Sequence, residues 1–224
     1  MNQLRTKAII LRRTNYGEAD RVLQLLTPND GKIGAIAKSV RREKSKLAGG
    51  LELFAVSDVT ILSGKGDLGI VSSARLEKFY GNILHDYDRL QLGYEIIKQV
   101  AKAVETIPEN AFYELLRQSF EYLDEAGIDA RLIEIWFRLQ LAILLGVGLN
   151  VVTDINGMKL VEDSQYQFNT SDMAFEHTPT GKFTTRHIKL LRLLTLRDPR
   201  IISKVSGIGD LVDDCLWLAR IVHE

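Results

Sequence analysis

The sequence contains one cysteine in 224 residues, and this scarcity excludes an internal disulfide bond. A chain without disulfides is compatible with a reducing cytoplasm, where we expect this protein to act. Cys215 itself falls on an apolar stripe at helical spacing, between Ile208 and Val222. The spacing predicts a helix whose buried face includes Cys215, and not a nucleophilic thiol.

Long apolar runs are also missing. The run that starts at Ala8 stops at Arg12, which is too short for the hydrophobic part of a secretory leader. The most apolar segment, Leu139–Leu149, is too short to cross a bilayer and is preceded by charged residues. No membrane role is expected.

The familiar catalytic motifs are absent as well. We find no HExxH, no GxSxG and no P-loop, and no pair of acids in a catalytic setting, so no enzymatic activity and no cofactor are expected. The stretch Gly64–Val71 matches a dinucleotide fingerprint by its letters, but a strand-like run follows it where that site requires a helix. We interpret it as a glycine-rich turn between strands.

Metal ligands are scarce too. Residues 150–180 hold only His177 as a possible zinc ligand, and a zinc site needs a tetrahedral set of cysteine and histidine. No metal is therefore expected. The remaining histidines are scattered along the chain, and we expect them to be surface or capping residues.

The net charge of zero conceals an asymmetry between the two parts of the chain. Residues 1–80 carry a net charge of +6, and residues 81–224 carry −6. A basic N-terminal part is typical of a module that binds a polyanion. The 46% hydrophobic and 26% charged content fits one or two folded domains with a substantial core.

The N-terminal part reads as strands joined by turns. Between two of these runs, Thr27 to Gly31 carries the proline and glycine of a tight turn and predicts a hairpin. Five runs predict an OB-type Greek-key barrel, while an SH3-like barrel or an open sheet remains possible from the pattern alone. The runs are Lys7–Arg13, Arg21–Thr27, Lys32–Val40, Ala55–Leu62 and Leu68–Leu76.

Beyond Tyr80 the apolar period changes to that of helices, so we expect an α+β protein with an OB-fold domain at 1–80 and a helical domain at 81–224. Asp129 is placed to cap the third helix, which should be the buried centre of this body. Residues 150–180 break the helical pattern and predict an irregular excursion. The predicted helices are Asp86–Thr106, Glu109–Ala126, Asp129–Leu145, Arg186–Leu196 and Asp210–His223.

A basic segment follows the hairpin turn, and its only acid between Gly31 and Lys46 is Glu43. We expect its bases, with two arginines of the first run, to line a groove that neutralises phosphates, Arg41 and Arg42 foremost. Tyr16 would either stack on a base or pack against its own hairpin. The full set of candidate DNA-binding residues is Arg12, Arg13, Tyr16, Lys32, Lys38, Arg41, Arg42, Lys44 and Lys46.

These same residues carry a resemblance to a known family. The segment RRTNYGEADR at 12–21, followed by LTP at 26–28, VRR at 40–42 and LAGGL at 47–51, resembles the N-terminal signature of RecO, the bacterial recombination mediator. The similarity continues through SARL at 73–76 and thins after Gly146.

The resemblance implies an N-terminal OB fold on a helical domain. It also implies binding of single- and double-stranded DNA, association with RecR and with the acidic tail of single-strand-binding protein, strand annealing, and help in loading RecA during repair at the nucleoid. Many members carry a four-cysteine zinc element, but Thr153 and Asn156 stand where the first cysteine pair is expected. The excursion thus resembles a degenerate zinc ribbon that folds without metal.

Two functions of other classes compete with this interpretation. In one, the barrel is an adaptor whose basic face receives an acidic peptide without touching DNA. In the other, it is an RNA-binding OB protein of translation, which would prefer RNA to DNA of the same sequence. Capture of the acidic tail peptide by the barrel would favour the adaptor.

Overall fold

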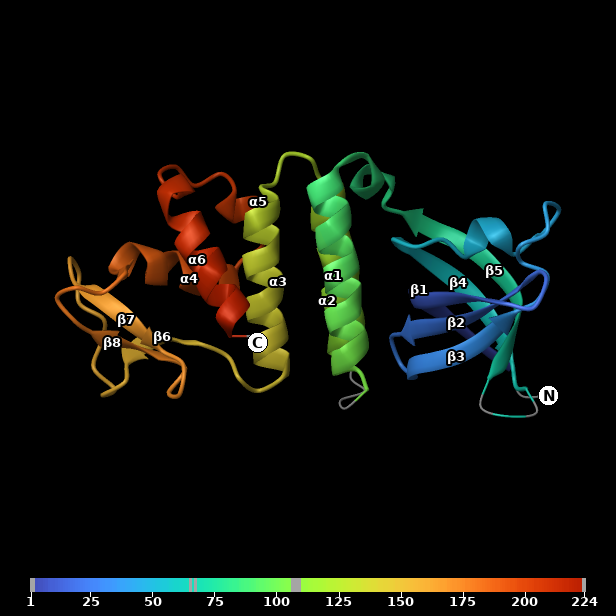
Figure 1. The fold of residues 1–224 in the computed structure, drawn as a ribbon, viewed down its shortest axis with the longest axis horizontal. Coiled ribbons are helices and arrows are strands. Elements are labelled where there is room, and N and C mark those ends of the chain that lie inside the picture. The colour runs from blue at the N-terminus through green and yellow to red at the C-terminus, as the bar shows by residue number, and fades with distance from the viewer. Residues whose placement is uncertain (1–2, 65, 67, 106–109, 223–224) are drawn as a thin grey trace. The chain divides into compact units, whose positions relative to one another are not determined.

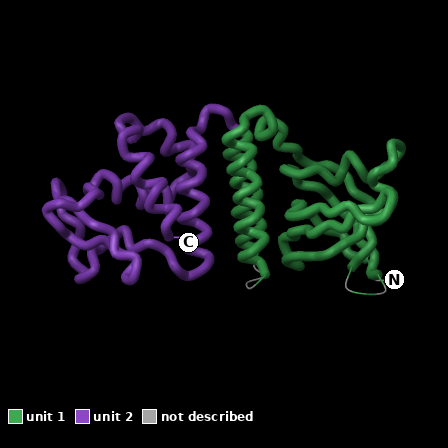
Figure 2. Tube along the Cα trace, viewed as in Figure 1, with its two compact units in different colours: residues 1–124 green, residues 125–224 purple. Residues whose placement is uncertain are grey.

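The computed structural model describes residues 3–64, 66, 68–105 and 110–222. The chain forms two compact units, residues 1–124 and 125–224 (Figure 2). The predicted helix ends at Thr106, Glu109 and His223, and two residues of the glycine-rich stretch, Lys65 and Asp67, lie outside the described residues. No helix in the described ranges is both long and apolar enough to cross a membrane.

The first unit begins with a closed five-stranded barrel of order β1-β2-β3-β5-β4 (Figure 1). Neighbouring strands are antiparallel except β3 and β5, which are parallel. This closure confirms the predicted OB-type barrel and excludes an open sheet. Its strands are β1 Gln3–Tyr16, β2 Asp20–Thr27, β3 Gly31–Ala37, β4 Ala55–Leu62 and β5 Gly69–Phe79.

Alternation of side chains along these strands fills the barrel with aliphatic groups, among them Ile10, Leu25 and Val59. The β2–β3 hairpin is confirmed, and Gly31 at its end has a φ of +62°, which glycine adopts without strain. In β1 the register shifts between Ile10 and Arg12, so Leu11 is an extra residue that bends the strand.

The long β3–β4 connection contains a short helix, η1 Ala48–Gly50. A Cβ atom on Gly50 would lie 2.4 Å from the carbonyl oxygen of Ala74, so only glycine allows this close approach to β5. Val40 and Leu51, on either side of η1, are 3% and 2% exposed and belong to the barrel core. The connection is therefore anchored to the barrel at both ends.

Helices η2 Gly81–His85, α1 Tyr87–Ala103 and α2 Asn110–Asp124 complete the first unit. The rings of Phe54 and Tyr80 pack on Phe120 of α2. The Phe120 ring centroid lies 5.4 Å from that of Phe54 and 5.7 Å from that of Tyr80. The contacts thus group α1 and α2 with the barrel. The expected domain division after residue 80 coincides with the end of the barrel strands and stays a prediction.

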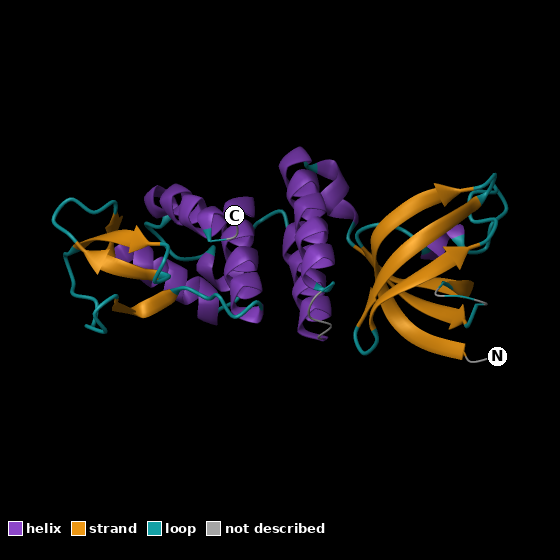
Figure 3. Ribbon diagram, turned by 60° about the horizontal axis from the view of Figure 1, so that its bottom comes forward, coloured by secondary structure: helices purple, strands orange, loops and turns teal. Residues whose placement is uncertain are grey.

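Within its described residues the second unit contains four helices, α3 Ala130–Leu144, α4 Thr185–Leu196, α5 Pro199–Ile202 and α6 Gly209–Ile221. Figure 3 draws helices in purple and strands in orange. Asp129 caps α3 as predicted, since its side chain accepts a hydrogen bond from the Arg131 N–H group. Most residues of α3 are buried. Cys215 is fully buried in α6, and burial raises the pKa of its thiol to about 12, which agrees with a core role.

The expected excursion is an ordered four-stranded sheet of order β6-β8-β7-β9. Its core is aromatic: the Phe175 ring lies 5.2 Å from Phe168 and 5.7 Å from Phe183. Within the described ranges, no group of His, Cys, Asp or Glu is arranged to hold a metal ion. Its likeness to a degenerate zinc ribbon stays a prediction. The strands are β6 Asn150–Asp154, β7 Gln165–Asn169, β8 Ala174–His177 and β9 Phe183–Thr184.

Candidate nucleic-acid interface

Two turns of the barrel are joined by hydrogen bonds at the ends of β1, β2 and β3. The backbone N–H of Arg41 donates to the Ala19 carbonyl at 2.9 Å, and its guanidinium donates to the Gly17 carbonyl at 3.4 Å. The backbone N–H of Ser39 donates to a carboxylate oxygen of Asp20 at 2.7 Å. The β1–β2 turn and the start of the basic segment are therefore one structural feature.

Five basic side chains project from the chain that follows β3, from residue 38 to residue 46. All are exposed, and none forms an ion pair with any residue that the structure describes. We call this set the basic rim. Exposed cations without an acidic partner keep their full attraction for phosphate groups. The basic rim consists of Lys38, Arg41, Arg42, Lys44 and Lys46.

Strand register separates the two arginines of β1. Arg13 lies opposite Leu23, whose side chain belongs to the barrel core, whereas Arg12 lies opposite Gln24. Because neighbouring side chains point to opposite faces, Arg12 and Arg13 cannot line the same groove wall. Arg13 also lies 3.5 Å from the carboxylate of Glu52, which partly neutralises it.

Tyr16 ends β1 and is 59% exposed. Of the two expected roles, packing against its own hairpin does not fit this exposure. An exposed aromatic ring on a barrel strand can stack on a nucleobase, and basic side chains without an acidic partner among the described residues follow nearby. It shares the outward face of β1 with Arg12, by strand alternation.

Lys32 is placed differently from the other bases of the segment. It lies in β3 opposite Leu26, and its ammonium nitrogen is 2.9 Å from a carboxylate oxygen of Glu105. The structure thus pairs Lys32 with an acid and leaves it out of the basic rim.

Arg21 has a place in this region that the sequence pattern did not suggest. It lies opposite Asn15, and its Nε–H group donates to the Asn15 amide oxygen at 3.3 Å. Strand alternation places Arg21 on the same face as Arg13 and Leu23. A count of bases in the segment after β3 could not reveal this place of Arg21. Aligning β1 with β2 across the turn that joins them would have revealed it.

Three further bases of the barrel have acidic partners. Lys7 pairs with Glu77, Arg75 with Asp58 at 3.1 Å, and Lys78 with Glu121 at 3.4 Å. Both lysines line a recess of about 380 Å³ beside Tyr80 and Tyr113. Its charges compensate one another within the first unit, so it offers no net attraction to a polyanion.

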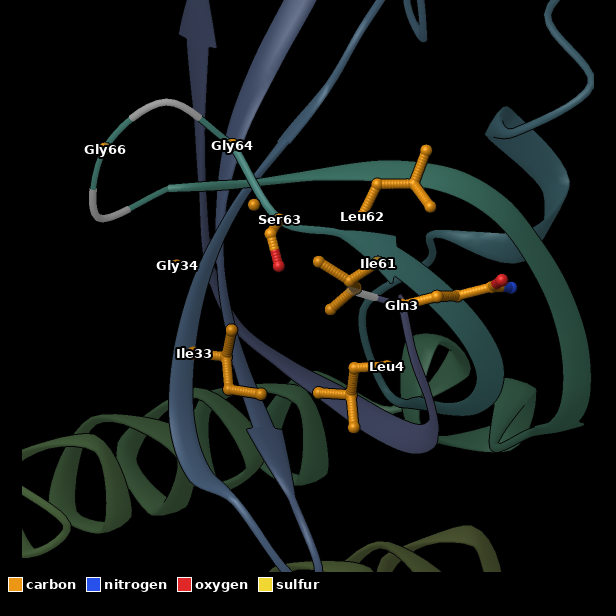
Figure 4. A pocket seen from close by; sticks show the side chains of 10 residues that line it. Gln3, Leu4, Ile33, Gly34, Ile61, Leu62, Ser63, Gly64 and Gly66 are labelled. Atoms are coloured by element: carbon orange, nitrogen blue, oxygen red, sulfur yellow. The ribbon is translucent and has the colours of Figure 1, made fainter. Parts of the chain in front are cut away.

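A second hollow lies beside the β4–β5 connection and has a volume of about 320 Å³. Figure 4 shows Leu4, Ile33 and Ile61 facing this space from three strands, with the Ser63 hydroxyl pointing toward it. None of its described lining residues carries a charge, so it does not complement a phosphate. The connection confirms the glycine-rich turn expected between these strands.

Comparison of the sequence with known proteins indicates a family. A family profile described as "Recombination protein O N terminal" matches residues 1–80, the barrel strands. Among curated proteins, the DNA repair protein RecO of Dehalococcoides mccartyi is 38% identical over 149 residues, which cover 65% of this chain and 57% of that protein. The DNA repair protein RecO of Acetivibrio thermocellus is 31% identical over 167 residues, covering 74% and 66%.

The chain spans only 57% of the length of the first of these relatives. A more distant one, the DNA repair protein RecO of Syntrophomonas wolfei, is 25% identical over 221 residues and aligns with 91% of this chain and 85% of its own. The similarity thus begins in the barrel and extends into the second unit. On this evidence, the chain belongs to the RecO family.

Proposed function

We propose that this protein is a non-enzymatic recombination mediator that binds DNA during repair. The observation that carries the proposal is the basic rim on an OB barrel: five exposed bases without an acidic partner among the described residues, in a segment whose start is bonded to the turn after the exposed Tyr16. The relatives named DNA repair protein RecO support the repair role.

In this proposal the basic rim neutralises backbone phosphates and releases their counterions. Arg12 and Tyr16 extend the site along β1, where the ring stacks on an exposed base. Contacts to phosphates and base faces carry little sequence information, so the protein binds single strands with little sequence preference. Duplex DNA is held through its phosphates alone.

We further propose that the protein anneals complementary strands and, with RecR, helps RecA load onto single strands coated with single-strand-binding protein. The acidic tail of that protein is a proposed partner. Neutralising phosphates on two strands at once lowers their repulsion, which is the physical basis for annealing. The proposed place of action is the cytoplasm, at nucleoid DNA under repair.

A strand-annealing assay tests this function. Two complementary oligonucleotides, one with a fluorophore and one with a quencher, should pair faster in the presence of the native protein. The variant Arg41→Ala/Arg42→Ala should lose most of this acceleration, because both bases belong to the basic rim. Equal acceleration by the two proteins would contradict the proposed site.

The basic rim also suits an acidic peptide, which keeps the adaptor function as the second candidate. Its test is a pull-down with the acidic tail peptide, alongside DNA binding at low salt. Capture that depends on Arg41 and Arg42 in a protein that does not bind DNA would establish the adaptor instead. Tighter binding of RNA than of DNA of the same sequence would favour a role in translation.

A further inference from the structure

An acidic side chain lies at the base of the basic rim, where a negative charge should oppose DNA. Asp20 begins β2 opposite Tyr16, and it is partly buried. Its carboxylate accepts the Ser39 N–H at 2.7 Å, a short bond of the charge-assisted kind. The contact links the start of β2 to the first turn after β3.

The backbone at Ser39 needs such a contact. Its φ is +53°, a left-handed conformation that residues other than glycine adopt only when their surroundings hold them there. Ser39 lies directly after Lys38 and two residues before Arg41. The direction in which these two bases leave the barrel therefore depends on the conformation of Ser39.

Two other contacts hold the far side of the turn. Val40 is 3% exposed in the barrel core, and the Arg41 N–H donates to the Ala19 carbonyl. Without Asp20, Val40 and Arg41 would still be attached, but the Ser39 N–H would lose its acceptor. The turn would then exchange between conformations in which Lys38, Arg41 and Arg42 diverge.

We propose that Asp20 is a positioning residue, which strengthens DNA binding by fixing the turn that carries Lys38, Arg41 and Arg42. This inference rests on the proposed function, because it concerns the same site. It opposes the simple electrostatic expectation that removing any acid near a phosphate strengthens binding.

Glu18 supplies a matched control for charge. It lies in the same β1–β2 turn, is exposed, and has no hydrogen bond or ion pair from its side chain to any residue within the described ranges. Glu18→Ala thus removes one negative charge and leaves the contact of Asp20 with Ser39 in place. Asp20→Asn removes the charge of Asp20 and keeps an oxygen that accepts the Ser39 N–H.

The experiment measures affinity for a labelled single-stranded oligonucleotide across a salt series. We expect Glu18→Ala and Asp20→Asn to bind at least as tightly as the native protein. Asp20→Ala should bind more weakly, and its log–log salt slope should flatten by about 0.7 for each phosphate contact that is lost. If Asp20→Ala binds as tightly as Glu18→Ala, the proposal is wrong.

Amide hydrogen exchange separates this inference from the proposed function. In the DNA-free protein, the peptide containing residues 38–42 should exchange faster in Asp20→Ala than in the native protein, Asp20→Asn or Glu18→Ala. Unchanged exchange in Asp20→Ala overturns the positioning role even if DNA binds. Faster exchange in a protein that does not bind DNA would retain the positioning of the turn and reject the proposed function.

Discussion

The ammonium nitrogen of Lys32 in β3 lies 2.9 Å from the Glu105 carboxylate, so this base is paired with an acid of the first unit. Glu105 follows the end of α1, and its side chain is 62% exposed. The sequence groups Lys32 with the bases of the basic rim, but the structure separates them. Lys32 is paired with Glu105, whereas the basic rim has no acidic partner among the described residues.

This pairing predicts different results for two single substitutions. Lys32→Ala should leave the salt dependence of single-strand binding unchanged, because Lys32 does not contact a phosphate. Arg41→Ala should flatten the log–log slope by about 0.7. Fluorescence anisotropy across a salt series measures both slopes. A slope that flattens equally in the two variants would place Lys32 in the DNA site.

Tyr16 should contribute through its ring and not through its hydroxyl. Tyr16→Ala should weaken single-strand binding by roughly 1 to 3 kcal/mol, the usual effect of losing one stacked base. Tyr16→Phe keeps the ring and should bind like the native protein, and duplex binding should change in neither variant. Because the side chain is 59% exposed, thermal stability should hardly change. An affinity loss as large in Tyr16→Phe as in Tyr16→Ala would argue against stacking.

The start of α4 should be sensitive to acid. Nδ1 of His187 accepts the Thr184 N–H at 3.1 Å, so the neutral imidazole takes the place of the glutamate in a capping box. Burial lowers the pKa of His187, and this outweighs the opposite effect of Asp214, whose carboxylate lies 3.6 Å from Nε2.

Since the pKa of His187 is lower in the folded protein, its imidazole binds a proton more readily in the unfolded chain. The second unit should therefore lose stability as the pH falls below 6.5, the ordinary pKa of histidine, towards the lower pKa of the folded state. The size of the loss follows from the difference between the pKa values of His187 in the unfolded and folded states. His187→Gln keeps an acceptor that does not titrate and should remove this part of the pH dependence. Denaturant unfolding at several pH values measures it, and identical pH profiles for the two proteins would contradict the role of His187.

The β6–β9 sheet should depend on its aromatic core. Phe175 is fully buried between Phe168 and Phe183, so Phe175→Ala should destabilise the second unit by about 3 to 5 kcal/mol. A strong chelator should leave the melting temperature of the native protein unchanged if the sheet needs no metal. A melting temperature that drops with chelator and recovers with added zinc would show a metal site instead.

The sequence pattern predicted the strands of the barrel well, because each is bounded by turn residues and carries its own apolar alternation. It predicted a barrel but left an open sheet possible, because the parallel pairing of β3 with β5 joins Ala35 to Gly69, residues far apart in the chain. The bulge at Leu11 was also hidden. The pattern ends the first strand at Arg13, whereas β1 continues to Tyr16.

The bases of the candidate site could be found from the sequence, but their surroundings could not. Charge counting treats Lys32 and Arg41 alike, although only the structure brings Glu105 to the first and Gly17 to the second. The β6–β9 strands were missed for a related reason. Each has five residues or fewer, as in β8 Ala174–His177, and too few alternations to distinguish a strand from a loop.

The most direct test of the basic rim compares two triple variants with the native protein in a salt series on single-stranded DNA. Arg41→Ala/Arg42→Ala/Lys46→Ala removes three bases without acidic partners among the described residues, whereas Lys7→Ala/Arg75→Ala/Lys78→Ala removes three paired ones and changes the net charge equally. We predict that the log–log slope flattens by about two units in the first variant and stays unchanged in the second. Equal flattening in both, or none in the first, would contradict a DNA site on the basic rim.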